Sequence, residues 1–109
     1  MHYTYIIYSS SADRFYIGST SDEISQRIRR HNAPHRGFTS MANDWRLVYL
    51  EQFDSIQQAR KRERQIKAWK SRKRMNLLIR IFAFLKIKEP QPLFQVLHHG
   101  SPLPTPWSP

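Results

Sequence analysis

Cysteine, long apolar runs and acidic residues are scarce or missing in this 109-residue chain. Without cysteine the chain can form neither a disulfide framework nor a cysteine-ligated zinc site. The longest apolar run, residues 77–85, is interrupted by Arg80 and is far shorter than the roughly 20 residues that span a bilayer. The N-terminal residues lack the basic segment and apolar run of a signal peptide. We therefore expect a cytoplasmic protein without a membrane partner.

Positive charge is what the chain has in excess. Its 18 Lys and Arg residues outnumber eight Asp and Glu residues, which gives a formal net charge of +10. Nine of the basic residues lie between Arg60 and Arg74, where Glu63 is the only acid. This charge favours a polyanionic partner, most often nucleic acid, over a merely soluble basic protein or one that lies on acidic lipid.

The length and composition predict one domain followed by a tail. A chain of this size holds a single modest core, and 39% hydrophobic and 13% aromatic residues argue against general disorder. The last twenty residues hold six of the seven prolines and no Lys, Arg, Asp or Glu. We predict a domain over residues 1–88 and a Pro-rich, flexible tail over residues 89–109.

Hydrophobic patterning predicts a small mixed fold. Three segments rich in aromatic and β-branched residues are predicted strands: residues 3–8, 14–19 and 45–50. A capping box at residues 20–23 is expected to open a first helix that ends near Asn32. Asp54 or Ser55 is expected to cap a second helix to about Trp69, and Ser71 a third to about Lys88. The predicted class is α+β, a three-stranded antiparallel sheet flanked by helices in the order ββαβαα.

The first predicted helix directs charged side chains inward. At 100° per residue, Ile24, Ile28, Arg27 and His31 share one face, whereas Arg29 points away. Because the isoleucines must face the core, Arg27 and His31 point inward or into the edge of a cleft. An inward arginine needs a bound anion or a structural partner, and the helix alone does not choose between them.

The second predicted helix has one acid on its apolar side. Glu63 lies in a stripe with Ile56, Ala59 and Ile66. It is either a ligand for a divalent metal, since Mg²⁺ takes one or two carboxylates together with waters and phosphate oxygens, or half of a helical ion pair with Lys67 or with a basic neighbour such as Arg60, worth about 0.2–0.5 kcal/mol.

The predicted hairpin supplies Tyr5, Tyr16 and Gly18. A glycine within a strand marks a bulge or a close backbone approach, whereas a strand tyrosine on its own is usually a packing residue. The order and spacing of these residues with Arg27 and Glu63 are more specific than any one of them.

Over residues 2 to about 80 the sequence resembles the GIY-YIG nuclease superfamily. Tyr16-Ile17-Gly18 is the complete second motif, and Tyr3-Thr4-Tyr5 retains the tyrosine of the first, with Tyr3 where the family has glycine. Arg27, followed by His31, resembles the helix-borne arginine. The chain is most similar to the small single-domain bacterial branch, which is related to the nuclease half of excinuclease C and to Slx-type endonucleases.

The resemblance implies a metal-dependent DNA endonuclease that hydrolyses phosphodiester bonds, is structure- rather than sequence-specific, and acts in DNA repair or recombination. Glu63 would hold a single Mg²⁺ or Mn²⁺ ion. Arg27 would bind the scissile phosphate, and Tyr16, placed with the help of Tyr5, would orient or deprotonate the attacking water. His31 would position water or relay the proton.

Other residues extend this set. His35 is a second histidine candidate for the role of His31. Seven basic residues are expected to contact the nucleic-acid backbone: Arg29, Arg30, Arg36, Lys67, Lys70, Arg72 and Lys73. Asn76 is the one candidate for a late asparagine that many relatives have near the site. The alternatives are a non-catalytic module that keeps the fold and binds DNA or RNA, and a protein-interaction adaptor.

Overall fold

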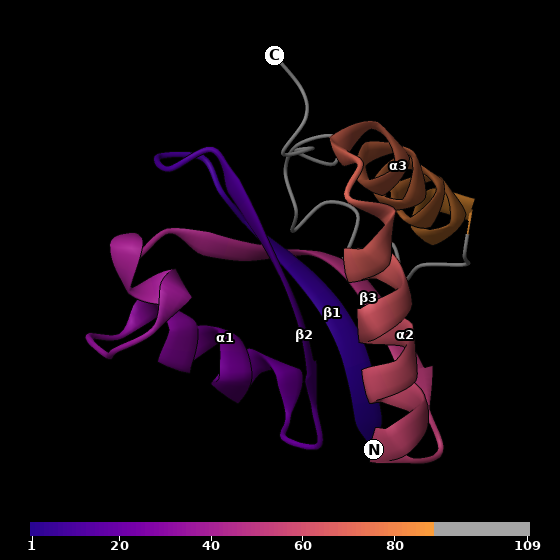
Figure 1. Cartoon of the computed structure of the whole chain (residues 1–109), viewed down its shortest axis with the longest axis horizontal. Coiled ribbons are helices and arrows are strands. Elements are labelled where there is room, and N and C mark those ends of the chain that lie inside the picture. The colour runs from indigo at the N-terminus through magenta and orange to yellow at the C-terminus, as the bar shows by residue number, and fades with distance from the viewer. Residues whose placement is uncertain (89–109) are drawn as a thin grey trace.

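A three-stranded antiparallel sheet with helices on both faces organises residues 1–88, the part of the chain that the computed structural model describes (Figure 1). The elements are β1 (His2–Ser9), β2 (Arg14–Thr20), α1 (Ile24–Asn32), the short 3₁₀ helix η1 (Phe38–Met41), β3 (Trp45–Phe53), α2 (Ile56–Trp69) and α3 (Arg72–Lys88). This order confirms the predicted ββαβαα arrangement. The tail predicted for residues 89–109 lies outside the described residues. Within residues 1–88, no helix is long and apolar enough to cross a membrane.

The central strand is β1, which pairs antiparallel with β2 on one side and β3 on the other. Residues 4–9 of β1 are all buried, because helices cover both faces of the sheet. In this register Tyr5 lies opposite Gly18 of β2 and Leu50 of β3. Alternate β1 residues face opposite sides of the sheet, with Tyr5 and Ile7 on one face and Ile6 and Tyr8 on the other.

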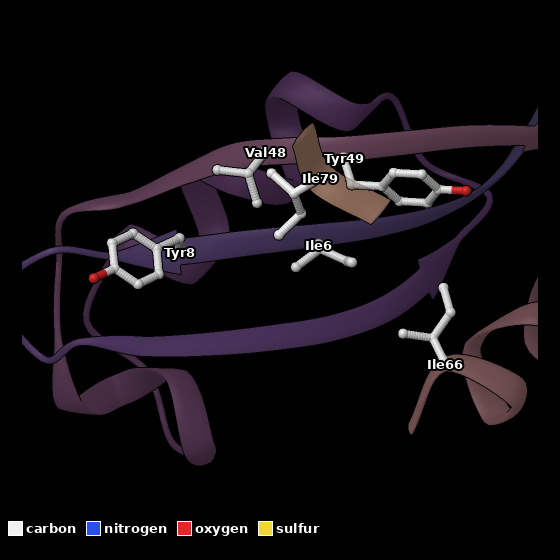
Figure 2. Close-up of a cluster of buried hydrophobic side chains, with 6 residues drawn as sticks. All are labelled: Ile6, Tyr8, Val48, Tyr49, Ile66 and Ile79. Atoms are coloured by element: carbon white, nitrogen blue, oxygen red, sulfur yellow. The ribbon is translucent and has the colours of Figure 1, made fainter. Parts of the chain in front are cut away.

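Two cores stabilise the fold, one on each face of the sheet. The core beneath α2 and α3 is shown in Figure 2 and contains Ile6, Tyr8, Val48, Tyr49, Ile66 and Ile79. The core beneath α1 contains Tyr5, Ile7 and Trp45, with Ile24 and Ile28 of α1 packed against it. Burial of these apolar surfaces is the main source of stability. Since α1 and α2 cover opposite faces, functional groups can meet only where both helices reach the edge of the sheet.

The helix starts agree with the sequence in two cases out of three. Ser55 forms a complete capping box with Gln58 at the start of α2, and Ser71 Oγ accepts a hydrogen bond from the Arg74 amide at 3.2 Å. The capping box predicted at residues 20–23 is wrong, because Glu23 is the N-cap of α1 and makes no side-chain capping bond. Thr20 is instead the last residue of β2, and its Oγ1 accepts from the Asp22 amide at 3.0 Å in the turn toward α1.

Candidate active site

Gly18 permits two tyrosines to meet over β2. A Cβ atom at this position would lie 2.6 Å from Tyr5 Oη and 2.9 Å from Cε2 of Tyr16. The Tyr5 ring therefore lies directly on the β2 backbone, and its centroid is 6.3 Å from that of Tyr16. This is the close backbone approach that a glycine within a strand indicates.

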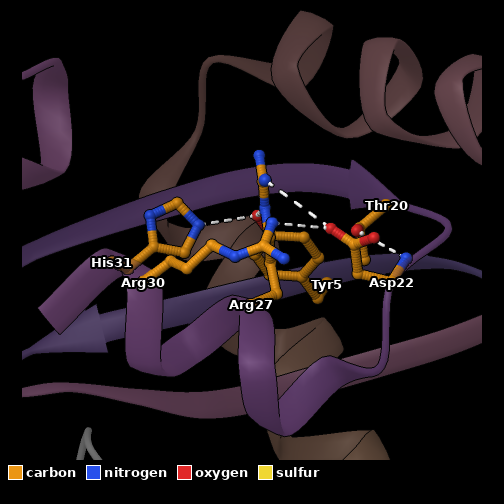
Figure 3. A network of polar contacts seen from close by, with 6 residues as sticks. All are labelled: Tyr5, Thr20, Asp22, Arg27, Arg30 and His31. Atoms are coloured by element: carbon orange, nitrogen blue, oxygen red, sulfur yellow. Dashed lines mark hydrogen bonds and ion pairs between the residues drawn. The ribbon is translucent and has the colours of Figure 1, made fainter. Parts of the chain in front are cut away.

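Helix α1 brings Arg27 and His31 to the Tyr5 hydroxyl (Figure 3). Arg27 Nε donates to Tyr5 Oη at 3.4 Å, and Tyr5 Oη is 2.8 Å from His31 Nε2. His31 is buried, with 8% of its surface exposed. Arg29 is exposed on the opposite side of the helix. The inward orientation expected for Arg27 and His31 is confirmed.

The Ala33 carbonyl determines which groups donate and which accept in the hydrogen bonds around His31. His35 Nδ1 is 2.6 Å from the Ala33 carbonyl, which can only accept, so in the neutral ring Nε2 accepts from Thr39 Oγ1 at 2.7 Å. Thr39 Oγ1 then accepts from His31 Nδ1 at 2.8 Å. His31 Nε2 is left as an acceptor for the Tyr5 hydroxyl. Both ring nitrogens of His31 are thereby occupied.

Burial fixes the protonation states of this chain of groups. It raises the pKa of Tyr5 to about 12, against the opposing effect of the hydrogen bond from Arg27. Burial, together with the positive charge of Arg27 and the proximity of His35, lowers the pKa of His31 to about 4. Tyr5 is therefore a phenol and His31 a neutral imidazole at ordinary pH.

The depressed pKa of His31 predicts acid sensitivity in a defined window. Between the ordinary value of 6.5 and about 4, the unfolded chain binds a proton that the folded chain does not, so stability falls as the pH drops. We expect the free energy of unfolding to decrease by about 3 kcal/mol across this window. Urea denaturation at several pH values measures the change.

The variant His31→Gln serves as the control for this prediction, since it should lose most of the pH dependence between pH 6.5 and 4. Asp13 and Asp44 also have lowered pKa values, owing mainly to hydrogen bonds from Tyr8 and Ser9, but their ordinary value is 3.8. Their effects therefore appear at more acidic pH. A pH profile shared by the parent and the variant would contradict the assignment to His31.

A cavity of about 250 Å³ opens beside these groups, between α1 and η1. It is lined by Tyr16, Arg27, Arg30, His31, His35, Arg36, Gly37, Phe38 and Thr39. Among these described lining residues there are three arginines and no carboxylate. The Tyr16 hydroxyl makes no hydrogen bond within residues 1–88. Such a cavity is suited to an anion such as a phosphate group.

Asp22 neutralises part of this arginine cluster from outside the cavity. Its carboxylate lies 2.9 Å from an Nη atom of Arg30 and 4.0 Å from one of Arg27. Figure 3 marks the polar contacts of Asp22 with dashed lines. Because the side chains of Asp22 and Arg30 are 44% and 60% exposed, the pair contributes only about 0–1 kcal/mol. A phosphate can therefore replace Asp22 at small cost.

Glu63 reaches the same edge of the sheet from the opposite face. Its Oε1 accepts from Ser19 Oγ at 2.6 Å, and Ser19 follows Gly18 in β2. Its Oε2 accepts a hydrogen bond from the ammonium group of Lys67. The i,i+4 ion pair that the sequence offered as an alternative to a metal ligand is therefore present. The Glu63 side chain is 19% exposed, and its negative charge disfavours ionisation of Tyr5.

The surroundings of Glu63 fit a divalent cation held by a single protein carboxylate. Within residues 1–88 no cluster of three or more His, Cys, Asp or Glu side chains could enclose a metal. A site with one carboxylate, completed by water and phosphate oxygens, suits Mg²⁺. Oε2 is paired with the ammonium group of Lys67, which a metal ion would have to displace.

The seven basic residues predicted to contact nucleic acid do not form one uniform surface. Three of them are ion-paired with acids: Arg30 with Asp22, Lys67 with Glu63 and Arg72 with Asp13. Arg72 also lies over the Phe15 ring at 5.0 Å. Arg36 lines the cavity, whereas Arg29, Lys70 and Lys73 are exposed outside it.

Sequence reasoning missed Thr39, Phe38 and Asp22. Thr39 and Phe38 lie in a segment without helical or strand periodicity, so no pattern placed them at the site. Asp22 was assigned to a capping box that does not form. Asn76 belongs to α3, which packs on β3, the edge strand opposite β2, and it does not line the cavity.

Comparison with known proteins agrees with this geometry. Residues 1–76 match the GIY-YIG catalytic domain. A UPF0213 protein of Staphylococcus saprophyticus is 31% identical over 77 residues, which cover 71% of this chain and 93% of the relative. A UPF0213 protein of Haloquadratum walsbyi is 35% identical over 77 residues, 70% of this chain and 84% of the relative. No solved structure matches significantly.

A GIY-YIG domain is typical of endonucleases, and these nucleases generally use divalent metal ions. The match spans both strand tyrosines, the arginine of α1 and the glutamate of α2. The chain belongs to the GIY-YIG family.

Proposed function

We propose that the protein is a metal-dependent endonuclease that hydrolyses phosphodiester bonds in DNA. One observation supports this most strongly: Tyr16, Arg27 and Glu63 reach the β2 edge of the sheet from three different elements. The arginine-lined cavity offers positive charge to a phosphate, and the Glu63 carboxylate would hold a cation; phosphodiester cleavage needs both kinds of charge.

Arg27 binds the scissile phosphate in this proposal. Its Nε donates to Tyr5 Oη at 3.4 Å, and within residues 1–88 the one ion pair of its Nη groups is with the carboxylate of Asp22, at 4.0 Å. Replacement of Asp22 by a phosphate would leave the guanidinium orientation unchanged. A planar guanidinium matches two phosphate oxygens better than an ammonium group does.

Tyr16 orients or deprotonates the attacking water. Tyr16 lines the cavity, and its hydroxyl makes no hydrogen bond within residues 1–88, so it is available to a water molecule. Both ring nitrogens of His31 are engaged, by Tyr5 and Thr39. These contacts favour Tyr16 over His31 as the group nearest the nucleophile, and they give His31 a positioning role through Tyr5. His35 is engaged in the same way.

Glu63 would hold a single Mg²⁺ or Mn²⁺ ion, with Ser19 fixing one carboxylate oxygen. Lys67 would leave Oε2 and become available to a neighbouring phosphate. When bound, the metal would stabilise negative charge on a non-bridging oxygen and on the leaving 3′ oxygen.

Substrate choice in this proposal depends on nucleic-acid structure. Phosphate contacts by basic side chains do not distinguish sequences and weaken steeply with salt. The order of elements in residues 1–88 is not that of a zinc finger or a homeodomain, two modules that read bases in the major groove. We therefore propose that cleavage is structure-specific. We also propose that the protein acts in the cytoplasm, in DNA repair or recombination.

Labelled duplex, single-stranded and branched DNA, incubated with the purified protein in Mg²⁺ or Mn²⁺, tests this function. We expect cleavage with either metal, and removal of the metal with EDTA should reduce it to background because Glu63 alone cannot stabilise the leaving oxygen. Tight, salt-sensitive binding without cleavage would instead support the non-catalytic module, with DNA or RNA as its partner. Binding to proteins but not to DNA would support the adaptor.

A further inference from the structure

Phe38 presents an aromatic ring at the rim of the cavity. It is the first residue of η1 and is 52% exposed. Its ring is stacked on that of Tyr16, with centroids 6.2 Å apart and an interplanar angle of 25°. The contact with Tyr16 covers only part of Phe38, and about half of the residue stays exposed to solvent. This exposed part is accessible to a ligand.

The turn that carries Phe38 is held by hydrogen bonds on the buried side. Thr39 is 3% exposed, and its hydroxyl contacts His31 and His35. Its carbonyl accepts from Trp45 Nε1 at 2.9 Å. On the other side of Phe38, the Gly37 carbonyl accepts from Ser40 Oγ at 2.6 Å. Phe38 is thus displayed by an ordered turn, and its orientation does not have to be fixed by the ligand.

The neighbours of the ring define the chemistry of that ligand. Arg27, Arg30 and Arg36 line the same cavity, so a phosphate in the cavity lies next to an aromatic face. Proteins that bind single strands combine these two features, with cations along the backbone and aromatic rings under the bases. In a duplex the base faces are covered by their neighbours and cannot reach such a ring.

We infer that Phe38 is a stacking site for an unpaired nucleobase next to the phosphate that enters the cavity. The inference rests on the proposed function, because that phosphate fixes where the base lies. The substrate is accordingly single-stranded or has an unpaired strand at the point of cleavage.

The test measures binding by the full chain carrying Glu63→Gln, which prevents cleavage during the measurement. The probes are an oligonucleotide containing 2-aminopurine and the same oligonucleotide paired in a duplex. Phe38→Leu should weaken single-strand binding about 5- to 150-fold, the range for the loss of one stacked base, and should abolish quenching of 2-aminopurine. Duplex affinity should not change. Phe38→Trp should retain or increase the quenching.

Met41→Ala is the matched control, since Met41 is also exposed, at 50%, in the same turn but does not line the cavity. It should bind both probes as the parent does. If Phe38→Leu binds the single strand as tightly as the parent, or weakens both probes equally, the stacking site is refuted and Phe38 only packs on Tyr16. Failure of the parent to bind either probe would refute the proposed function together with the site. Should the leucine variant not fold, quenching by Phe38→Trp that is weaker than the parent's would refute the inference.

Discussion

Replacing Glu63 with glutamine is expected to lower the cleavage rate by about a thousandfold or more, because a bound metal contributes several kcal/mol of charge stabilisation. The amide has nearly the same shape and keeps an oxygen for the bond from Ser19 Oγ, which is 2.6 Å long in the parent. The negative charge that attracts Lys67 is lost. We therefore expect inactivity in a folded protein. Single-turnover cleavage measures the activity, Mn²⁺ titration measures metal binding, and thermal melting measures the stability of the fold.

Glu51→Gln is the matched control for this experiment. Glu51 also accepts from a cation, Arg62 at 3.0 Å, and from the hydroxyl of Tyr49. It belongs to β3, however, the edge strand opposite β2. Its replacement should leave cleavage and Mn²⁺ binding intact. Equal losses in the Glu51 and Glu63 variants would show that any missing acid has this effect, and full activity of Glu63→Gln would place the metal elsewhere.

A single methyl group at Gly18 is expected to lower both the cleavage rate and the stability of the protein. The Cβ of Gly18→Ala would lie 2.6 Å from Tyr5 Oη and 2.7 Å from its Cζ, so the buried ring must move. That shift breaks the contacts of Tyr5 with His31 and Arg27. Overpacking of this kind costs about 1–3 kcal/mol of stability. Misplacement of a reacting group by 1 Å costs about a hundredfold in rate.

A double-mutant cycle separates this clash from a general weakening of β2. Denaturation is measured for Gly18→Ala in the parent and in a Tyr5→Leu background, which removes the two shortest contacts of the methyl group and leaves the one with Tyr16 Cε2 at 2.9 Å. We expect Gly18→Ala to cost markedly less in the second background. Equal costs in the two backgrounds would mean that Tyr5 is not what the methyl group meets.

The side-chain orientations that follow from helical periodicity could be predicted from the sequence. The 3.6-residue period of α1 placed Arg27 and His31 on the same face as Ile24, and the structure keeps them there. The same reasoning placed Glu63 on the apolar side of α2, where it is 19% exposed. Period and polarity determine such orientations because a helix must bury its apolar side chains.

The parts that depend on a single turn could not be predicted in this way. Thr39 and Phe38 owe their positions to a 3₁₀ turn in a polar segment, and only the folded chain brings Thr39 to His31. The capping box predicted at residues 20–23 was wrong for the same reason, because its hydrogen bonds depend on the geometry of one turn. A hydroxyl there can bond to several nearby amides, and the turn from β2 into α1 uses it for Asp22.

The positions of α1 and α2 on opposite faces have a consequence for how accurately the site is assembled. Arg27 and Glu63 are carried by helices that pack on opposite faces of the sheet. Ser19 and Gly18, consecutive residues of β2, contact the glutamate and the tyrosine that holds the arginine. The backbone of β2 therefore fixes the position of Arg27 relative to Glu63, and the lengths of the loops that precede α1 and α2 do not determine it.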